Sequence, residues 1–352
     1  MKILDQNRIR QCKRAFATRR IPFDAMRTLL SADSRPKAGD LVLARVTKLG
    51  SHSRIELPSG RRASLFPGDE ILLTYGNRYA PDQYEAYVPD TLAPCHMVAA
   101  GGVAAQATAW HDRLSGPTAI EPIGLVADAE RCALNLADFA VSASTASLPG
   151  NVFAVFGTAM NAGKTTTAAS LVKGFTRAGY AVGAAKITGT GAGGDLWLMR
   201  DSGAVEALDF TDAGFPTTFG VDPSAILDGA SELMRTLAAQ GCSVIVLEIA
   251  DGLYQTETAA LAESEAFRSM LTGTFFAAGD AMGAAAGAGQ LAELGHTVLG
   301  ISGSLTRSPL AVREAAVTAC APVYTIDDLI DPESAASFVG QSALGYALAS
   351  GQ

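Results

Sequence analysis

Residues 151–167 read NVFAVFGTAMNAGKTTT. The stretch begins with an apolar run of strand-forming residues, 152–156, and continues through a turn that contains Gly157 and Gly163. Lys164 and three threonines follow, and the next residues, AASLVKGFTRAG, have a helical pattern. A strand, a glycine loop, a Lys-Thr pair and a helix in this order are typical of a loop that cradles phosphate groups.

The chemistry of this loop follows from its residue types. Glycines let the backbone approach an anion closely, and the loop N–H groups and the helix N-terminus supply partial positive charge. We expect Lys164 to neutralise the β- and γ-phosphates and the Thr165 hydroxyl to contact Mg²⁺. Thr158 stands where the strict pattern has glycine, so a structural glycine turn with an exposed lysine is the alternative. The predicted nucleotide-binding residues are Gly157, Thr158, Asn161, Ala162, Gly163, Lys164, Thr165 and Thr166.

The segment GTAMNAGKTT resembles the phosphate loop of dethiobiotin synthetase and its relatives, which has the form GT-x-x-x-x-GKT. That group includes cobyric-acid-synthase-type amidotransferases, molybdopterin-guanine-dinucleotide adaptor proteins and MinD/ParA-type ATPases. The segment also resembles the loop of the DUF1611 group of P-loop proteins, some of which are reported as amino-acid N-acyltransferases. The resemblance covers roughly residues 151–330 and implies a P-loop NTPase domain.

From residue 152 onward, apolar strand patterns alternate with helical patterns. Continuous apolar strands with helical crossovers predict an α/β fold with a mostly parallel, doubly wound sheet. Ligands of such sheets bind beyond the carboxyl ends of the strands, where the loop lies. The predicted strands are 152–156, 181–187, 244–249, 274–278, 297–301 and 323–326, and the predicted helices are 165–178, 223–240, 256–270, 281–294, 309–320 and 332–349.

The N-terminal part has a different character. Residues 1–30 are basic and predicted to be helical, and we favour a solvated, packed helix over a patch for an anionic ligand. Residues 31–141 alternate strand formers with Gly, Pro and Asp turns, which predicts a smaller β-rich domain, either a barrel or a sandwich. Residues 142–150, SASTASLPG, predict a linker, and a nucleotide-binding domain then occupies 151–352.

Composition limits the class of protein. The 352 residues are 48% hydrophobic and 18% charged, which is typical of a globular protein with at least two domains. A formal net charge of −8 disfavours a general nucleic-acid binder. No apolar run is long enough to cross a bilayer and the first residues lack an apolar signal core, so we expect a cytoplasmic protein. The five cysteines show no CxxC spacing, which favours reduced thiols.

A magnesium site needs one or two carboxylates besides the phosphates. The strand VIVLEIADG presents Glu248 near its end and Asp251 just after it. In the dethiobiotin synthetase group a glutamate at the corresponding strand end helps to hold the metal, so the resemblance favours Glu248 over Asp251. After the second strand, Asp195 is the candidate for a second metal-side carboxylate, and Asp209 and Asp212 are its rivals.

The stretch that begins with Lys186 and Thr188, KITGTGAGG, resembles the KPVxTG segment of dethiobiotin synthetases, although Ile187 replaces the proline. The resemblance implies that Lys186 and Thr188 face the second substrate and the phosphate. We also expect its glycines to offer N–H groups to an anion. In the related group a segment after a late strand holds the purine, and residues 299–304 occupy that place. Because no NKxD motif follows, ATP is favoured, while GTP stays open. The glycines of the run are Gly189, Gly191, Gly193 and Gly194.

Together these features predict an Mg-ATP-dependent phosphotransferase or ligase. It would transfer the γ-phosphoryl group to a small-molecule carboxylate, carbamate or hydroxyl, and an amine could then close an activated carboxylate or carbamate. The resemblance implies a homodimer. One alternative is a DUF1611-type N-acyltransferase, whose loop would bind the phosphates of acyl-CoA. Another is a nucleotide-hydrolysing switch or adaptor, although residues 158–160 lack the early lysine of ParA-type proteins.

Overall fold

The computed structural model describes residues 2–31, 34–142 and 144–339. The described chain divides into two compact units. Unit 2 begins at Ser142, where the sequence predicts a linker. The division is not a single cut, however, because two segments from the C-terminal half belong to unit 1. Unit 1 comprises Met1–Val141, Gly189–Gly194 and Phe210–Val221, and unit 2 comprises Ser142–Thr188, Asp195–Asp209 and Asp222–Gln352.

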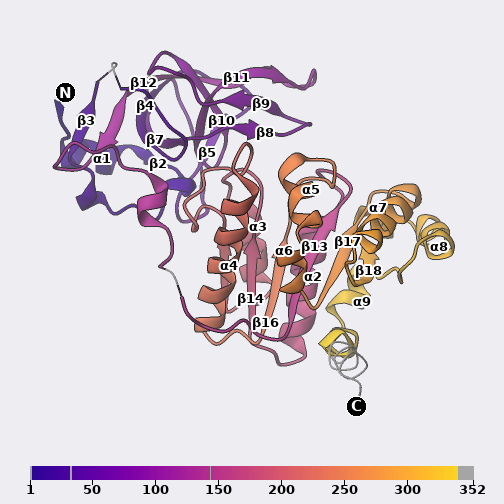
Figure 1. The fold of residues 1–352 in the computed structure, drawn as a ribbon. Coiled ribbons are helices and arrows are strands. Elements are labelled where there is room, and N and C mark those ends of the chain that lie inside the picture. The colour runs from indigo at the N-terminus through magenta and orange to yellow at the C-terminus, as the bar shows by residue number, and fades with distance from the viewer. Residues whose placement is uncertain (1, 32–33, 143, 340–352) are drawn as a thin grey trace. The chain divides into compact units, whose positions relative to one another are not determined.

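Unit 2 is built on a parallel sheet, whose order among the described residues is β15-β14-β16-β13-β17-β18 (Figure 1). The central strands are buried along their whole length, which explains their continuous apolar sequences. Because all pairs are parallel, the carboxyl ends of the strands meet at one edge. The strands are β13 (Val152–Gly157), β14 (Val182–Lys186), β15 (Glu206–Asp209), β16 (Val244–Glu248), β17 (Gly273–Ala277) and β18 (Val298–Ser302).

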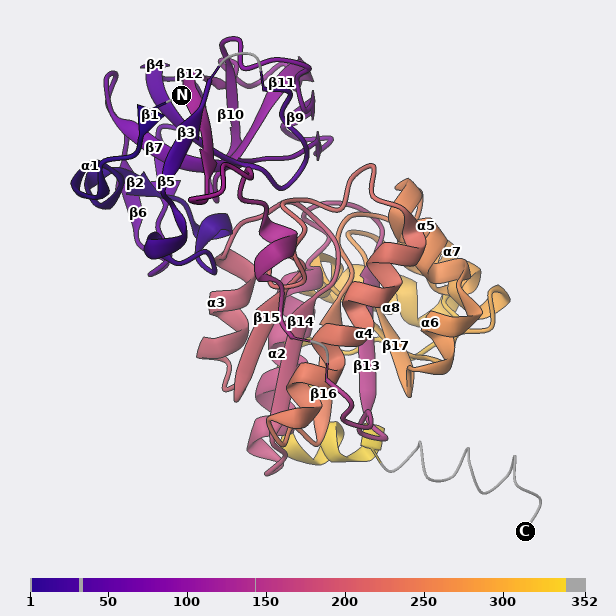
Figure 2. The ribbon, with the colours of Figure 1, turned by 60° about the vertical axis from the view of Figure 1, so that its left-hand side comes forward.

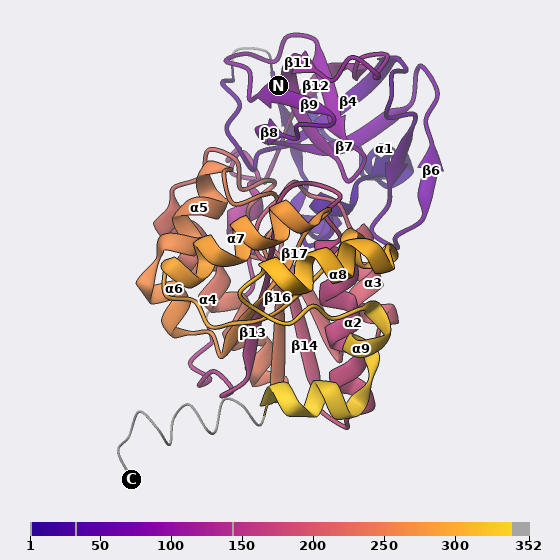
Figure 3. The same cartoon turned by 90° about the vertical axis from the view of Figure 1, so that its right-hand side faces the viewer.

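Helices cover both faces of this sheet, which confirms the predicted doubly wound α/β fold. Helices α2 and α9 lie over one face (Figure 3), and α4 lies over the other (Figure 2). No helix within the described ranges is both long and apolar enough to cross a membrane. The helices are α2 (Lys164–Arg177), α3 (Gly194–Asp201), α4 (Pro223–Ala239), α5 (Thr256–Glu263), α6 (Glu265–Ser269), α7 (Ala281–Glu293), α8 (Pro309–Thr318) and α9 (Ile326–Ile330).

Four elements of unit 2 differ from prediction. The predicted strand 323–326 is wrong, because only Val323 forms an isolated bridge and a Thr325–Asp328 capping box then starts α9. The predicted helix 256–270 is two helices, since the Ser264 side chain caps α6 and interrupts the first helix. Strand β15 and helix α3 are not among the elements that the sequence pattern predicts. Of the predicted helix 332–349, residues 332–339 are helical and the remainder lies outside the described residues.

Unit 1 contains a closed β-barrel, which is one of the two predicted forms. Strand β12 pairs with β4, β4 with β7, β7 with β11, β11 with β10, and β10 with β12, so the ring closes. Closure removes the free edges of these strands. The β7–β11 pair is parallel and the other pairs are antiparallel. The barrel strands are β4 (Leu41–Lys48), β7 (Glu70–Tyr75), β10 (Cys95–Ala99), β11 (Val103–Trp110) and β12 (Thr118–Ala127).

Shorter strands extend this framework within unit 1. Strands β1, β3, β8 and β9 lengthen the sheet beyond the barrel, β2 pairs with β7, and β5 and β6 form a separate two-stranded sheet among the described residues. Their bounds are β1 (Lys2–Ile3), β2 (Lys13–Arg14), β3 (Thr28–Leu30), β5 (Arg54–Glu56), β6 (Arg62–Ser64), β8 (Arg78–Tyr79) and β9 (Tyr84–Tyr87).

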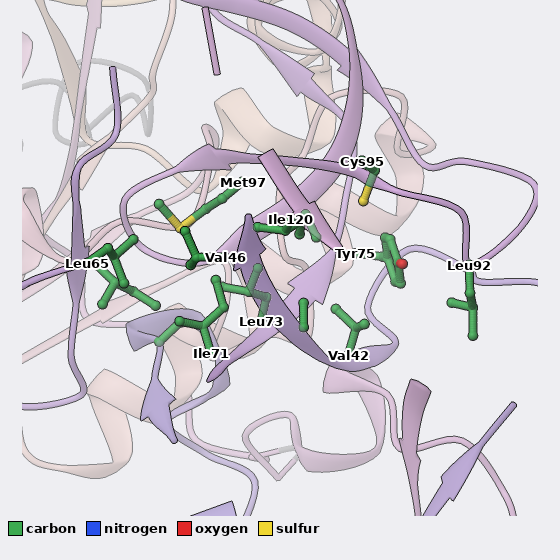
Figure 4. Packing of buried hydrophobic residues seen from close by; sticks show 14 of the residues in the cluster. Val42, Val46, Leu65, Ile71, Leu73, Tyr75, Leu92, Cys95, Met97 and Ile120 are labelled. Atoms are coloured by element: carbon green, nitrogen blue, oxygen red, sulfur yellow. The ribbon is translucent and has the colours of Figure 1, made fainter. Parts of the chain in front are cut away.

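Strand β7 and the first half of β4 are buried on both faces. Alternate residues of β4 and β7, such as Val42 and Leu73, pack in one cluster with Met97 and Ile120 (Figure 4). The residues between them, such as Leu43, pack in a second cluster with apolar side chains of the N-terminal segment. Side chains of a strand alternate between its faces, so burial of both faces explains the apolar runs DLVLARV and EILLTY.

The prediction of a helical N-terminal segment is largely wrong. Among the described residues of this segment, 2–30, only α1 (Gln6–Gln11) is α-helical, and it is followed by single 3₁₀ turns at Phe16–Thr18 and Phe23–Ala25. Tertiary contacts override the helical pattern after α1, because the backbone of Lys13 and Arg14 pairs with β7. The cations of this segment also pair with carboxylates of unit 1. Arg8 contacts Glu70 at 2.7 Å. These basic side chains therefore serve the packing of unit 1. Further pairs join Lys13 to Asp69, and Arg19 and Arg20 to Asp212.

Candidate phosphate-binding site

The loop between β13 and α2, residues 157–164, is shaped by its glycines. Gly163 directly precedes α2 with φ of 98°, and Asn161 has φ of 64°, so the loop turns through left-handed conformations. A Cβ at Gly157 would lie 2.7 Å from Cγ of Lys164 and 2.8 Å from the carbonyl oxygen of Ala277. A larger residue at position 157 would therefore fill the space that the loop encloses. We call residues 157–164 the phosphate loop.

Neighbouring segments of unit 2 hold the phosphate loop in place. The N–H of Thr158 donates to the carbonyl of Ala277 at 3.0 Å. The N–H of Ser304 donates to the carbonyl of Ala162 at 2.8 Å, which brings the segment predicted to hold the purine against the loop. A Cβ at Gly252 would lie 2.1 Å from the carbonyl oxygen of Thr158. Sequence reasoning missed Gly252, although its place soon after a buried strand is a usable signal.

Lys164 is not the exposed lysine of the alternative reading. Its side chain is largely enclosed, since the residue is only 6% exposed. Its ammonium donates to the carbonyl of Ala159 at 2.7 Å, so it is turned into the phosphate loop. Burial lowers the pKa of Lys164, and the nearby carboxylates of Glu248 and Asp251 oppose that shift. A largely buried ammonium at the N-terminus of a helix is suited to an anionic ligand.

Helix α2 and the ends of two strands bring the predicted metal residues together. The Thr165 hydroxyl lies 2.7 Å from Oε1 of Glu248, at the end of β16, and 3.1 Å from Oδ1 of Asp195, in the first turn of α3. Lys186, at the end of β14, forms an ion pair with Asp195. Four residues that are far apart in sequence thus meet beside the phosphate loop, as the strand-end rule predicts.

The pKa values of the ionisable groups in this cluster are shifted in different directions. Burial, reinforced by the charge of Asp195, raises the pKa of Glu248 to about 7. Burial opposes ionisation of Asp195 and Lys186 as well, but their mutual attraction prevails, so the pKa of Asp195 is lowered and that of Lys186 is raised. Oε2 of Glu248 is buried and has no hydrogen-bond partner within the part of the chain that the structure describes. Such an oxygen is costly unless a cation or donor satisfies it.

This set of oxygens fits Mg²⁺. The ion prefers oxygen ligands and keeps several waters, and one or two carboxylates with substrate phosphates complete its shell. Thr165, Glu248 and Asp195 supply a hydroxyl and two carboxylates beside the phosphate loop. Within the described ranges, no group of three or more His, Cys, Asp or Glu side chains is placed to hold a metal ion.

Thr188 is placed differently from expectation. It is 2% exposed, and its hydroxyl donates to the carbonyl of Ala250 at 2.6 Å. Its hydroxyl proton is therefore engaged within the protein. Asp209 is buried at the end of β15, in register with Lys186, whereas Asp212 pairs with arginines inside unit 1.

The prediction that the glycine run after Lys186 binds an anion is wrong for three of its amides. Their N–H groups already donate to acceptors within the protein. Gly189 donates to Thr218 Oγ1 at 2.9 Å, Gly191 to the carbonyl of Pro216 at 2.9 Å, and Gly193 to Oε2 of Glu56 at 3.0 Å. A Cβ at Gly101 would lie 2.1 Å from the carbonyl oxygen of Gly191. These glycines serve a close approach of backbone segments inside unit 1.

Comparisons with known proteins add little to the geometry of the candidate site. No family model and no curated protein matches the sequence. One similar solved structure is the Signal Recognition Particle 54 kDa protein from Aeropyrum pernix K1 in complex with GDP, with 16% identity, a TM-score of 0.38, and coverage of 56% of this chain and 50% of that one. Another is the signal recognition particle receptor FtsY from Elizabethkingia anophelis, with 16% identity, a TM-score of 0.36, and coverage of 55% of this chain and 66% of that one. This chain thus spans half to two thirds of their lengths, and these values assign it to no family.

Proposed function

We propose that this chain binds an Mg-nucleotide at the carboxyl edge of the unit 2 sheet and transfers its γ-phosphoryl group to a small-molecule acceptor. One observation supports the proposal most. The Thr165 hydroxyl, directly after the phosphate-loop lysine, is hydrogen-bonded to a buried glutamate that keeps a second oxygen unsatisfied. A hydroxyl and a strand-end carboxylate beside a glycine loop are the protein ligands that Mg-nucleotide sites use.

Each residue of the cluster has a specific task in this proposal. The amides of the phosphate loop and Lys164 bind the phosphates, and Thr165, Glu248 and Asp195 would hold Mg²⁺. When bound, Mg²⁺ neutralises charge on the phosphate oxygens. Lys186 is paired with Asp195, so it orients that carboxylate and places a positive charge near the transferred group.

The chemistry would rest on positioning and charge stabilisation. Phosphoryl transfer needs little covalent participation by the protein, because its transition state is stabilised mainly by oriented charges. An acceptor carboxylate or carbamate would become a mixed anhydride with release of the nucleoside diphosphate. An amine could then attack its carbonyl carbon to form a C–N bond and release inorganic phosphate, as in a ligase, whereas a hydroxyl would simply be phosphorylated. We favour ATP as the nucleotide because the sequence lacks NKxD after the late strand, and we expect a homodimer.

A nucleotide-hydrolysing switch is the second candidate. The observation that favours it is that residues Gly189–Gly194 and Phe210–Val221 belong to unit 1. The first segment continues directly into Asp195, and the second follows Asp209. A change in what Asp195 or Asp209 binds would therefore be passed along the chain to backbone segments that belong to unit 1. In such a protein, hydrolysis would proceed without an acceptor and would gate the binding of a partner.

Calorimetric titration with ATP, GTP and acetyl-CoA, each with and without Mg²⁺, separates these functions. The proposal predicts that ATP binds in this titration only when Mg²⁺ is present. In a separate assay of phosphate transfer from ATP, it predicts that a metabolite extract stimulates the transfer. Binding of acetyl-CoA alone would overturn it in favour of an acyltransferase. Phosphate release that is equal with and without the extract would favour the switch.

A further inference from the structure

The carbonyl oxygen of Ala250 accepts two threonine hydroxyls. Oγ1 of Thr188, just beyond β14, lies 2.6 Å from it, and Oγ1 of Thr258, in the first turn of α5, also lies 2.6 Å from it. Thr188 is 2% exposed and Thr258 is fully buried. Ala250 lies two residues after Glu248 and directly before Asp251. All of these residues belong to unit 2.

This arrangement saturates the carbonyl. A peptide oxygen has two lone pairs, and each buried hydroxyl must find an acceptor to avoid a desolvation cost. Thr258 is itself held at the start of α5, because its N–H donates to Oε1 of Gln255 at 2.9 Å. The two hydroxyls therefore tie the segment after β16 to both the end of β14 and the first turn of α5.

Other contacts fix the same segment at its two ends. The N–H of Ile249 donates to the carbonyl of Val155 at 3.0 Å, which continues the ladder between β16 and β13. Gly252 lies so close to Thr158 that a Cβ would meet its carbonyl oxygen at 2.1 Å. Between these points, the Ala250 carbonyl is held from the side by the two threonines. The segment 249–252 is thus held along its length.

We infer that Thr258 and Thr188 are positioning residues, whose hydroxyls fix the strand-end segment that carries Glu248 and Asp251. The inference rests on the proposed function, because the benefit of a fixed Glu248 is a defined Mg²⁺ site. Partners that orient metal ligands typically change metal affinity or activity about 10–100-fold when they are removed. Neither threonine is a catalytic residue in this account, since both hydroxyls are engaged with Ala250.

The test uses the full chain and three variants. Thr258→Val keeps the shape of the side chain and removes its hydroxyl, and Thr258→Ser keeps the hydroxyl. Thr236→Val is the matched control, because that hydroxyl also donates to a backbone carbonyl, that of Glu232 at 2.8 Å, but on α4. Two quantities are measured: the Mg²⁺ midpoint for ATP binding, and amide hydrogen exchange of residues 249–254 in the protein without nucleotide.

We expect Thr258→Val to raise the Mg²⁺ midpoint at least about tenfold and to speed exchange of residues 249–254. Thr258→Ser should restore both quantities, and Thr236→Val should change neither. If Thr258→Val leaves both quantities unchanged, or if the serine variant fails as badly as the valine variant, the inference is wrong while the proposed function stands. If the wild-type protein shows no Mg²⁺-dependent ATP binding, the proposed function itself is overturned and this inference with it.

Discussion

The hydroxyl of Thr165 lies 2.7 Å from Oε1 of Glu248. The contact joins the first turn of α2 to the carboxyl end of β16, whose last residue is in register with Val155 of β13. It therefore connects the start of α2 to a strand-end carboxylate whose other oxygen is buried without a hydrogen-bond partner among the described residues. Predictions about this pair test whether the two residues hold Mg²⁺. They also test how far the buried carboxylate of Glu248 destabilises the folded protein.

Glu248→Gln should weaken metal binding and stabilise the protein without ligand. The pKa of Glu248 is raised from 4.5 to about 7, so the folded state favours the protonated form. Stability from this group is present below pH 4.5 and is lost as pH rises through about 7. Glutamine avoids that loss, so the melting temperature at pH 8 should be higher in the variant. Differential scanning calorimetry measures it, and a lower value would contradict the assigned pKa.

Mg²⁺-dependent nucleotide binding should strengthen as pH rises through about 7. A carboxylate must be deprotonated to bind a metal ion, so protonation of Glu248 competes with Mg²⁺. The pKa of Asp195 is lowered, so that group contributes no step in this range. The Mg²⁺ midpoint for ATP binding at a series of pH values reports the effect. The terminal phosphate of ATP also titrates near this range, with a pKa of about 6, so the series in Glu248→Gln gives the baseline. The slope should be smaller in that variant, and equal slopes in the two proteins would show that Glu248 is not the titrating group.

Acid should destabilise the barrel through His52. Burial lowers the pKa of His52 from 6.5 to about 4, and its ring packs against Tyr84 at 5.4 Å. The unfolded chain gains a proton on this histidine between pH 6.5 and 4, while the folded chain does not. The free energy of unfolding should therefore fall as pH falls through this window, by at most about 3 kcal/mol. Urea unfolding at several pH values measures the slope, and His52→Phe should reduce it.

Removing one partner of the Arg19–Asp212 ion pair should destabilise unit 1. The carboxylate of Asp212 is 4% exposed, and Arg20 lies farther away, at 3.6 Å. Removing Arg19 leaves Asp212 with the more distant partner Arg20 alone, so the cost should stay below the about 3–5 kcal/mol of a fully uncompensated buried charge. Arg19→Met should therefore lower the urea midpoint clearly, and the double variant with Asp212→Asn should recover part of the loss. An equal fall of the urea midpoint in the single and double variants would show that the charge of Asp212 does not cause the destabilisation.

The site could be predicted from sequence where short-range patterns and strand order decide the geometry. The run GTAMNAGKTT placed Lys164 and Thr165, and the parallel sheet then brought Glu248 to the same edge. The roles of Thr188 and of the glycine run could not be predicted in this way. Their partners, Ala250 and the side chain of Glu56, come from distant segments, and only the tertiary structure shows that those donors are already used.

The N-terminal segment shows the same limit. Its helical pattern and cluster of cations read as a solvated helix, but its ion pairs with Glu70 and Asp212 need residues about 60 and 190 positions away. Beyond α1, backbone pairing of Lys13 and Arg14 with β7 replaces helical hydrogen bonds. The barrel itself could be predicted only as a barrel or a sandwich, because closure depends on the pairing of β10 with β12, which alternation within a strand does not reveal.

Calorimetric titration of Mg-ATP into the wild-type protein and Lys164→Ala tests whether residues 157–164 bind the phosphates of a nucleotide. Lys164 lies inside the phosphate loop and donates to the carbonyl of Ala159, so its ammonium is placed for phosphate. The account predicts saturable binding to the wild type that requires Mg²⁺, and loss of that binding in Lys164→Ala with the circular dichroism spectrum unchanged. Equal binding of Mg-ATP by the two proteins would contradict the assignment of residues 157–164 as a phosphate loop.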